Sequence, residues 1–580
     1  MLEGILALFS VGYPTSFFIK SERPGFWTTN VHFGWHYQQE GVSEPQPCLI
    51  PVEKPENGIR VFVLGESAAM GTPDPSFGFA RILEVMLRRF YPDRPVEVVN
   101  AAMRGFNSHL ITGIARECAG LNPDVFVVYA GNNEFNGLYG PKTSLAFLGE
   151  HPGLIPAFHQ AKRTHVGQLL RRVFDANPEA RQARKLVRDA GFFQSRCTAW
   201  DDPARACVYR NFRANLERIC QEGLNAGVGV VVATIGANLR DCPPLGSLHR
   251  EGLTQSQREQ WEMLYREGGQ FETAGDAGQA MSRYEKALEI DDHFAELHYR
   301  LARCRLRLGD GDAAASEFSL ARDWDALQFR ADSRINQAIR DAAAASESPG
   351  VRLVEIDKVL ARSDPCCAGS PGQEFFFEHV HLRFAGDYEV ARAMLPEVVA
   401  CLRGRGAAPV ESVEVPTKED CAKALAHTPW DEVNTAAAMV KLTANPPFTG
   451  QLDHARRQGA AEKAIATAME NVDQRFIDQV LAAYRQAIDT RPDDWVLRYN
   501  LGTFLQQLQR PREAAPYLEQ VVATLPDSAP FRVQWGQALG QAGLIDQAAR
   551  QFQEALKRDP RYKSAREGLL WVGARRRLVP

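Results

Sequence analysis

The sequence predicts a two-part architecture, in which a three-layer α/β domain with a doubly wound parallel sheet is joined to an all-α solenoid of short repeats. Short apolar runs alternate with helical segments over roughly the first 400 residues, which is the pattern of parallel strands connected by helices. A second pattern, with a period of 34 residues, recurs in two later parts of the chain. The length of 580 residues exceeds what one hydrophobic core supports, so at least two domains are expected.

The strands of the sheet are predicted from apolar runs rich in valine, isoleucine and phenylalanine. Continuous runs of this kind are typical of strands buried on both faces, as in parallel sheets. Helical patterns over 79–90 and 209–226 have an apolar stripe and separate these runs along the chain. The five predicted strands are 59–64, 96–99, 124–129, 228–234 and 351–356.

The 34-residue period is clearest near the C-terminus, where Pro492, Pro526 and Pro560 are evenly spaced. Tyr284 and Phe318 show the same interval earlier in the chain. This is the period of tetratricopeptide (TPR) repeats, each of which is a helix–turn–helix unit. Because no unit buries its apolar face alone, the units are expected to stack into a solenoid.

The domain boundaries follow from these two patterns. The α/β domain is expected at 55–255 and 329–403, interrupted by a TPR pair at 256–328. Within it, the polar and basic segment 138–206 follows the third strand, so it is expected to be either a solvent-exposed helical decoration or a lid over the sheet edge. The other parts are an N-terminal segment at 1–54, a helical linker region at 406–460 and a C-terminal TPR domain at 461–580, with three repeats over 461–562 and a closing helix over 563–577.

The composition is that of an ordinary globular protein, with 45% apolar and 24% charged residues. The formal net charge of −4 gives no basic face for nucleic acid, so no nucleic-acid partner is expected. Eleven cysteines are scattered without metal-ligand spacing, and Cys366 and Cys367 are adjacent. Reduced structural thiols are therefore favoured over a disulfide framework.

The first twenty residues are apolar but contain Glu3, Gly12 and Pro14. These interrupt the run before it reaches the roughly 20 apolar residues of a transmembrane helix. An amphipathic helix packed on the domain is expected here, and the alternative is a membrane-surface segment or the remnant of an anchor. The compartment stays open.

A candidate nucleophile follows the first predicted strand, in the triplet Gly65-Glu66-Ser67. A serine at this place lies at the carboxyl edge of the sheet, where ligands bind in open α/β folds. Its hydroxyl would need a base within hydrogen-bond reach and donors directed at the oxyanion of an acyl-transfer intermediate.

Two turns after the next strands offer such donors. Gly105 lies in the turn after the second strand, where its backbone N–H can face the sheet edge. Asn133 follows the third strand and carries a neutral amide donor that does not titrate. The alternative roles are a βα turn for Gly105 and an Asx-type cap for Asn133.

The candidate base is His381, three residues after the acid Glu378. A carboxylate in this position can accept from the imidazole Nδ1–H and leave Nε2 facing the serine, as in a serine triad. His379 and His381 could instead form a metal pair, but no third ligand is evident in the sequence, so neither a metal nor a cofactor is expected.

The four blocks at 65–68, 105, 131–134 and 378–381 together resemble those of the SGNH (GDSL-type) hydrolase superfamily. The resemblance covers roughly 55–255 and 329–403 and implies an SGNH-hydrolase-like fold with a flavodoxin-like strand order. It implies that Ser67 is the nucleophile and that His381 is the base, oriented by Glu378. Ser67, Gly105 and Asn133 would form the oxyanion hole. Glu66 and Glu378 stand where the family usually has aspartate.

The turn after the fourth strand adds Asn238 and Arg240 as possible substrate-binding residues. Arginine can hold a carboxylate or phosphate by a two-pronged contact. An ion pair between Arg240 and Asp241 within the loop is the alternative.

The function expected from these blocks is a serine esterase-type hydrolase that acts on an O-acyl ester, with TPR repeats that bind a protein partner in their groove. The family resemblance suggests an acetylated glycan or a lipid as the ester. Two alternatives stay open: an acyltransferase that uses a sugar hydroxyl as acceptor, and a catalytically inert TPR scaffold.

Overall fold

The structure is a computed structural model of the whole chain. Within the part of the chain that it describes, no helix combines the length and the hydropathy that crossing a membrane requires. The nine cysteines in this part are free thiols, and Cys366 and Cys367 lie outside it. The structure describes residues 3, 6, 12–38, 43–176, 190–346, 348–363 and 369–578.

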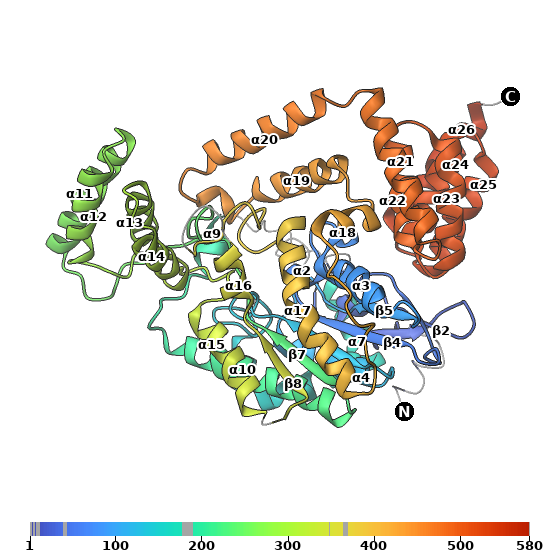
Figure 1. Cartoon of the computed structure of the whole chain (residues 1–580), viewed down its shortest axis with the longest axis horizontal. Helices are drawn as coiled ribbons and strands as arrows, with labels where there is room; N and C mark the ends of the chain where they lie inside the picture. The colour runs from blue at the N-terminus through green and yellow to red at the C-terminus, as the bar shows by residue number, and fades with distance from the viewer. Residues whose placement is uncertain are drawn as a thin grey trace.

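A five-stranded parallel sheet forms the centre of the molecule (Figure 1). Its order is β5-β4-β6-β7-β8, so the first strand along the chain lies between the second and the third. This is the flavodoxin-like order. The side chains of β4, β6 and β7 are buried throughout, which explains their continuous apolar sequences. The strands are β4 (Ile59–Gly65), β5 (Val96–Asn100), β6 (Val125–Tyr129), β7 (Gly229–Ala233) and β8 (Val351–Val354), and each coincides with a predicted run.

Helices cover both faces of this sheet. In Figure 1, α3 and α17 lie on one side of the strands, and α4, α10 and α15 lie on the other. The hydrophobic core of this domain is formed between these layers and the sheet. The helices are α3 (Phe79–Phe90), α4 (Ser108–Ala119), α10 (Pro203–Asn225), α15 (Ser333–Ala345) and α17 (Phe384–Gly404).

Shorter helices lie in the connections of the α/β domain. They are α2 (Ser67–Met70), α5 (Ala146–Glu150), α6 (Ile155–Arg163), α7 (His165–Ala176), α9 (Ala190–Gln194), α16 (Ile356–Ser363) and the 3-10 helices η1 (Phe33–His36), η2 (Pro75–Phe77) and η3 (Pro152–Leu154).

The N-terminal segment contains a small antiparallel sheet with the order β1-β2-β3. Its strands are β1 (Phe18–Lys20), β2 (Phe26–Thr29) and β3 (Leu49–Pro51). The predicted helix over the first twenty residues is therefore wrong at its C-terminal end, and most of its remainder lies outside the described residues. Strands this short contain too few residues to establish an alternating pattern.

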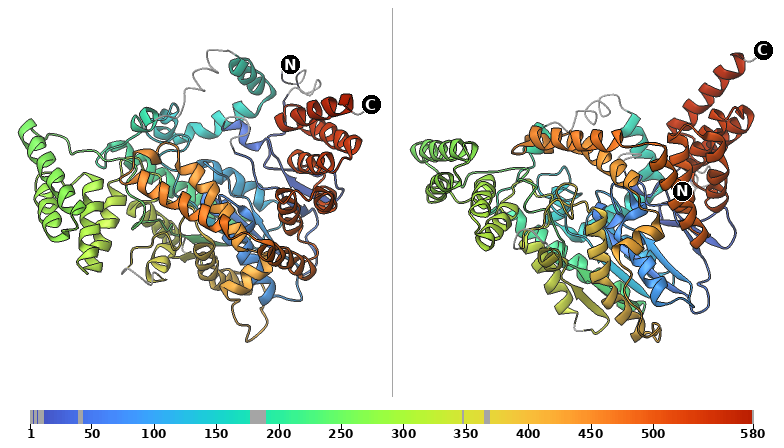
Figure 2. Two further views of the ribbon diagram at one scale, coloured as in Figure 1. Left: turned by 90° about the horizontal axis from the view of Figure 1, so that it is seen from above. Right: turned by 45° about the horizontal axis from the view of Figure 1, so that its top comes forward.

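Two helix pairs project from the α/β domain at the position of the TPR pair predicted for 256–328. Figures 1 and 2 place them at the opposite end of the molecule from the C-terminal helices. Tyr284 and Phe318, the two aromatic residues of the 34-residue period, are both buried between helices. The helices are α11 (Gln255–Thr273), α12 (Ala277–Leu288), α13 (Ala295–Arg307) and α14 (Gly311–Asp323).

The C-terminal helices stack in pairs, as the 34-residue period predicts. Before them, α20 packs against α19, so the domain boundary predicted at 461 falls inside α20. The helices are α18 (Lys418–Leu425), α19 (Pro429–Thr443), η4 (Phe448–Gly450), α20 (His454–Glu470), α21 (Gln474–Thr490), α22 (Trp495–Gln507), α23 (Pro511–Thr524), α24 (Ala529–Gln541), α25 (Ile545–Arg558) and α26 (Lys563–Leu578).

Candidate active site

Ser67 is the first residue of α2, directly after β4 at the carboxyl edge of the parallel sheet. Gly65 makes this turn possible, because a Cβ at that position would lie 2.2 Å from the carbonyl oxygen of Tyr129 on β6. The exposed fraction of Ser67 is 9%. The serine thus lies at the predicted edge, in a largely enclosed position.

His381 and Glu378 lie in the loop between α16 and α17. An isolated β-bridge between Phe376 and Leu382 closes this loop into a tight turn. Within it, the backbone N–H of His381 donates to Oε1 of Glu378 at 2.9 Å. The turn therefore determines how the acid and the imidazole face each other.

The loop brings His381 onto Ser67. Nε2 of His381 lies 2.9 Å from Oγ of Ser67, and Nδ1 lies 2.5 Å from Oε1 of Glu378. With a proton on Nδ1 facing the carboxylate, Nε2 is the acceptor for the serine hydroxyl. Burial, followed by the positive charge of Arg104, lowers the pKa of His381 to about 4. The imidazole is therefore neutral near pH 7 and able to take a proton.

Glu66 links the serine turn to the loop after β6. Its buried carboxylate accepts the backbone N–H groups of Asn132 at 2.8 Å and Asn133 at 3.2 Å. Burial, and next the charge of Glu134, raise the pKa of Glu66 well above its usual value. The role of this acid is to hold the two loops together.

The two predicted oxyanion donors lie in adjoining loops. Gly105 has a φ of +73°, a backbone conformation that favours glycine. Nδ2 of Asn133 donates to the carbonyl of Phe106 at 2.9 Å, so the side chain of Asn133 is fixed against the Gly105 turn. An amide carries a second N–H, and its donation to an oxyanion stays a prediction.

The N-terminal segment braces the Gly105 turn, which the sequence did not indicate. Nε2 of Gln38 donates to the carbonyl of Gly105 at 3.1 Å, and Oγ of Ser43 donates to that of Arg104 at 2.8 Å. Gln38 and Ser43 are isolated polar residues in a segment without a strong periodic pattern, so the sequence gives no signal that they support this turn.

Asn238 and Arg240 form contacts within their own loop, and Arg240 also contacts the loop between α16 and α17. Oδ1 of Asn238 accepts the backbone N–H of Asp241 at 2.9 Å. The guanidinium of Arg240 pairs with Asp241, at 3.3 Å, and with Glu374. The ion pair between Arg240 and Asp241, the alternative role of this loop, is thus present, and substrate binding by Asn238 or Arg240 stays a prediction.

His379 adds a second imidazole beside Glu378. Its Nδ1 contacts Oε2 of the carboxylate, and among the described residues these two and His381 form the one trio with ligand atoms within 4.8 Å of one another. Burial, then the charges of His381 and Arg330, lower the pKa of His379 well below its usual value. Because both nitrogens of His381 already face Ser67 and Glu378, a metal ion would have to displace the serine contact.

A cavity of about 300 Å³ lies beside Glu378. Its walls are largely apolar and come from α19 and α20, including Met439, Val440 and Ile465. The region predicted as a linker therefore lies next to Glu378. Within the described part of 138–206, Oε1 of Gln168 accepts the backbone N–H of Tyr13 at 2.9 Å, and a lid role for this segment stays a prediction.

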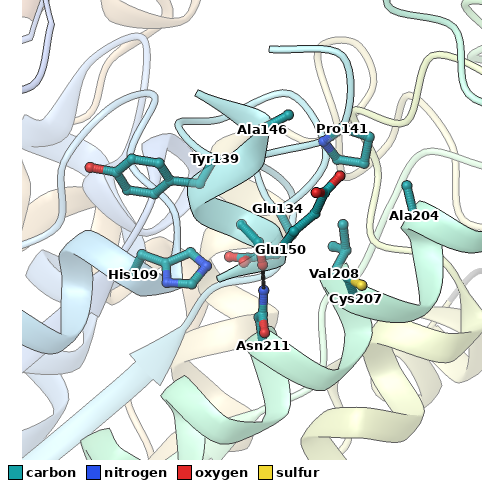
Figure 3. A pocket seen from close by; sticks show the side chains of 11 residues that line it. His109, Glu134, Tyr139, Pro141, Ala146, Glu150, Ala204, Cys207, Val208 and Asn211 are labelled. Atoms are coloured by element: carbon teal, nitrogen blue, oxygen red, sulfur yellow. Dashed lines mark hydrogen bonds between the residues drawn. The ribbon is translucent and has the colours of Figure 1, made fainter. Parts of the chain in front are cut away.

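Glu134 borders a much smaller cavity, of about 30 Å³, beneath α5 (Figure 3). Its carboxylate accepts the N–H and the hydroxyl of Ser108, both at 2.8 Å. Burial raises the pKa of Glu134 to about 7. Ligand pockets usually measure about 300 Å³ or more, so this cavity has room for water only.

Comparison with known proteins identifies the repeats. A tetratricopeptide repeat model matches residues 273–337, and a second one matches 465–529 and 533–580. A curated relative, DnaJ homolog subfamily C member 3 of Mus musculus, is 29% identical over 87 residues, which is 15% of this chain. The match spans 17% of that relative's length.

Solved structures with similar helices include other TPR proteins. YrrB, described as a TPR protein with an unusual peptide-binding site, is 21% identical and covers 25% of this chain and 76% of its own, with a TM-score of 0.17. A thermophilic TPR protein of Thermus thermophilus, TTC0263, is 14% identical and covers 54% and 99%, with a TM-score of 0.17. From the family models, this chain contains tetratricopeptide repeats both within the α/β domain and at its C-terminal end.

Proposed function

We propose that this chain is a serine ester hydrolase in which Ser67 is the nucleophile and His381 is the base. The single observation that carries the proposal is the 2.9 Å contact between Nε2 of His381 and Oγ of Ser67, with Glu378 on the opposite nitrogen. A buried and neutral imidazole between a serine and a carboxylate has the geometry needed to activate the hydroxyl.

The reaction begins when Oγ of Ser67 attacks the acyl carbon of an ester while its proton passes to Nε2 of His381. The carbonyl oxygen becomes an oxyanion, which the N–H groups of Ser67 and Gly105 and the amide of Asn133 stabilise. The intermediate then collapses as the bond to the alcohol breaks, and His381 returns the proton to that alcohol. Water then attacks the acyl-enzyme while His381 takes its proton. The bond between Oγ of Ser67 and the acyl carbon breaks, His381 returns the proton to Oγ, and the acid leaves.

The substrate class is an O-acyl ester, on a glycan or a lipid. This choice rests on the resemblance of the four sequence blocks to SGNH hydrolases. The low exposure of Ser67, 9%, also favours acyl transfer to a sugar hydroxyl as a second outcome of the same chemistry, because a secluded acyl-enzyme reacts slowly with bulk water.

The TPR repeats are proposed to bind a protein partner. Stacked TPR units present an extended concave surface, and two solved TPR structures are described as having a peptide-binding site and a complex with pHSP90. A scaffold without catalysis is the competing function, favoured by the fact that the family models match the repeats alone.

Labelling with a fluorophosphonate probe separates these functions. The parent protein is expected to be labelled and to hydrolyse p-nitrophenyl acetate, whereas Ser67→Ala loses both properties. Ser316→Ala is the matched control, because its hydroxyl bonds only within α14 and is exposed. Folded parent protein that neither labels nor turns over any of a panel of acyl esters would leave the scaffold function.

A further inference from the structure

Two sheet edges line a single cleft of about 1000 Å³. β5 is the edge strand of the five-stranded sheet, and β3 is an edge strand of the N-terminal sheet. Val96–Asn100 and Leu49 both border the cleft. Its opposite walls come from 414–417 and from 490–496, the start of the C-terminal repeats.

The outward edge of β5 can be assigned from its pairing with β4. The N–H of Ile59 donates to the carbonyl of Pro95, and the N–H of Ala101 donates to that of Val63. Since backbone groups alternate along a parallel strand, the odd-numbered residues of β5 face β4. The N–H and C=O groups of Val96, Val98 and Asn100 therefore point into the cleft.

Among the residues that the structure describes, none forms a hydrogen bond with the backbone N–H or C=O of Val96, Val98 or Asn100. An edge strand with free ladder groups is a template for another strand, and proteins usually cover or blunt it. No proline interrupts β5. Val96 and Asn100 are 3% and 9% exposed, and Val98 between them is half-buried, so Val98 offers the most open backbone groups of this edge.

The charge of the cleft favours a basic occupant. Its lining carries six carboxylates and four guanidinium groups. Two of each, Arg81, Arg491, Glu84 and Asp494, pair with one another. Glu97 pairs with Arg60. The remaining carboxylates of the lining, those of Glu414, Asp420 and Asp493, are exposed, as are the two remaining arginines, Arg88 and Arg89, so the lining keeps an excess of acidic groups.

We propose that the cleft is a docking site for an extended, basic segment of a partner protein, which adds as a strand to β5. Alternate N–H and C=O groups at strand spacing are met only by another extended polypeptide. The five residues of β5 span about 17 Å, enough for four or five residues of the partner. This site does not depend on the hydrolase activity.

The test is fluorescence anisotropy with a labelled seven-residue peptide of alternating valine or threonine and lysine. We expect binding with a dissociation constant below about 100 µM. A peptide N-methylated at alternate residues loses the N–H groups that pair with β5, so it is expected to bind at least about tenfold more weakly. An acidic peptide with glutamate for lysine is expected to bind more weakly than the basic one.

On the protein side, Val98→Pro removes one outward N–H and leaves the bonds to β4 intact, since proline is tolerated where the N–H faces away from the sheet. Val98→Pro is expected to raise the dissociation constant of the basic peptide at least about tenfold. Val98→Thr keeps the N–H and is expected to bind this peptide like the parent. The proposal would be overturned if the basic peptide does not bind, or if the N-methylated peptide binds as tightly as the basic one. These peptide measurements use the parent protein, so they test the proposal even if Val98→Pro does not fold.

Discussion

His381 and Ser67 lie 314 positions apart in the sequence, yet Nε2 of the histidine is 2.9 Å from Oγ of the serine. The inserted repeat helices α11–α14 lie between the two residues in the chain and project away from the sheet (Figure 2). Because the parallel strands all end at one edge, an insertion of this kind leaves the contact intact. The proposed site is therefore separate from the inserted helices, and single substitutions around His381 and Ser67 test it directly.

Asn133→Ala is expected to reduce turnover of an acyl ester by about 100-fold, which is typical for the loss of one oxyanion donor. The change also removes the bond to the carbonyl of Phe106. Measurement of kcat, with circular dichroism to check folding, tests this expectation. Asn136→Ala is the control, because Asn136 lies in the same loop and bonds instead to Gln328. Near-parent activity of Asn133→Ala would remove this residue from the mechanism.

Glu378→Gln is expected to lower kcat by about 10³-fold to 10⁴-fold, because the amide can present its N–H to Nδ1 of His381 and select the wrong tautomer. KM is expected to change little, since Glu378 lies on the far side of the imidazole from the serine. Glu374→Gln is the matched control on the same loop, where Glu374 pairs with Arg240. Equal loss in both variants would point to loop folding instead of His381 orientation.

The fall of kcat/KM at low pH is expected to have its midpoint below pH 6.5, the ordinary pKa of histidine. Burial lowers the pKa of His381 to about 4, so the base is neutral above that value and is lost as the pH falls through it. Arg104 is the second cause of this shift. Arg104→Gln is therefore expected to move this midpoint upward, and a pH profile between 3.5 and 8 measures both positions. A midpoint at or above 6.5 in the parent would contradict this assignment.

The strands and the four loops of the candidate site could be predicted because each depends on local sequence. Val61 to Leu64 is buried on both faces, so its continuous apolar run is the direct mark of a central strand. Ser67, Gly105 and Asn133 follow three such runs, and parallel strands carry the residues after them to one edge.

Other features depend on contacts between distant segments and could not be predicted. Gln38 and Ser43 support the turn at Gly105 only through single hydrogen bonds. The position of α20 on α19 was also not evident, because α20 has no buried residue and its composition resembles that of an ordinary exposed helix. Contacts of this kind are determined by tertiary packing, which produces no periodic pattern in the sequence.

A final prediction concerns the attachment of the C-terminal repeats to the α/β domain. Arg81 on α3 contacts Asp494 at 2.5 Å and Glu84 at 2.7 Å, and Arg491 lies 3.3 Å from Glu84. Asp494 and Glu84 are 5% and 9% exposed. Arg81→Ala leaves these carboxylates with Arg491 as their remaining buried partner. The free energy of unfolding is therefore expected to fall by about 2 kcal/mol, the cost of a lost hydrogen bond to a charged group.

Arg88→Ala is the matched control for this change. Arg88 pairs with the same Glu84 at 2.8 Å but is 50% exposed, so its loss is expected to cost less than about 1 kcal/mol. Urea titrations followed by tryptophan fluorescence measure the unfolding midpoints of both variants, and Trp495 is one of the nine tryptophans that contribute to the signal. If Arg81→Ala and Arg88→Ala shift the midpoint equally, the buried network does not hold the repeats in place. If Arg81→Ala alone shifts it, the double variant with Asp494→Ala measures the coupling between the two residues, which is expected to be favourable.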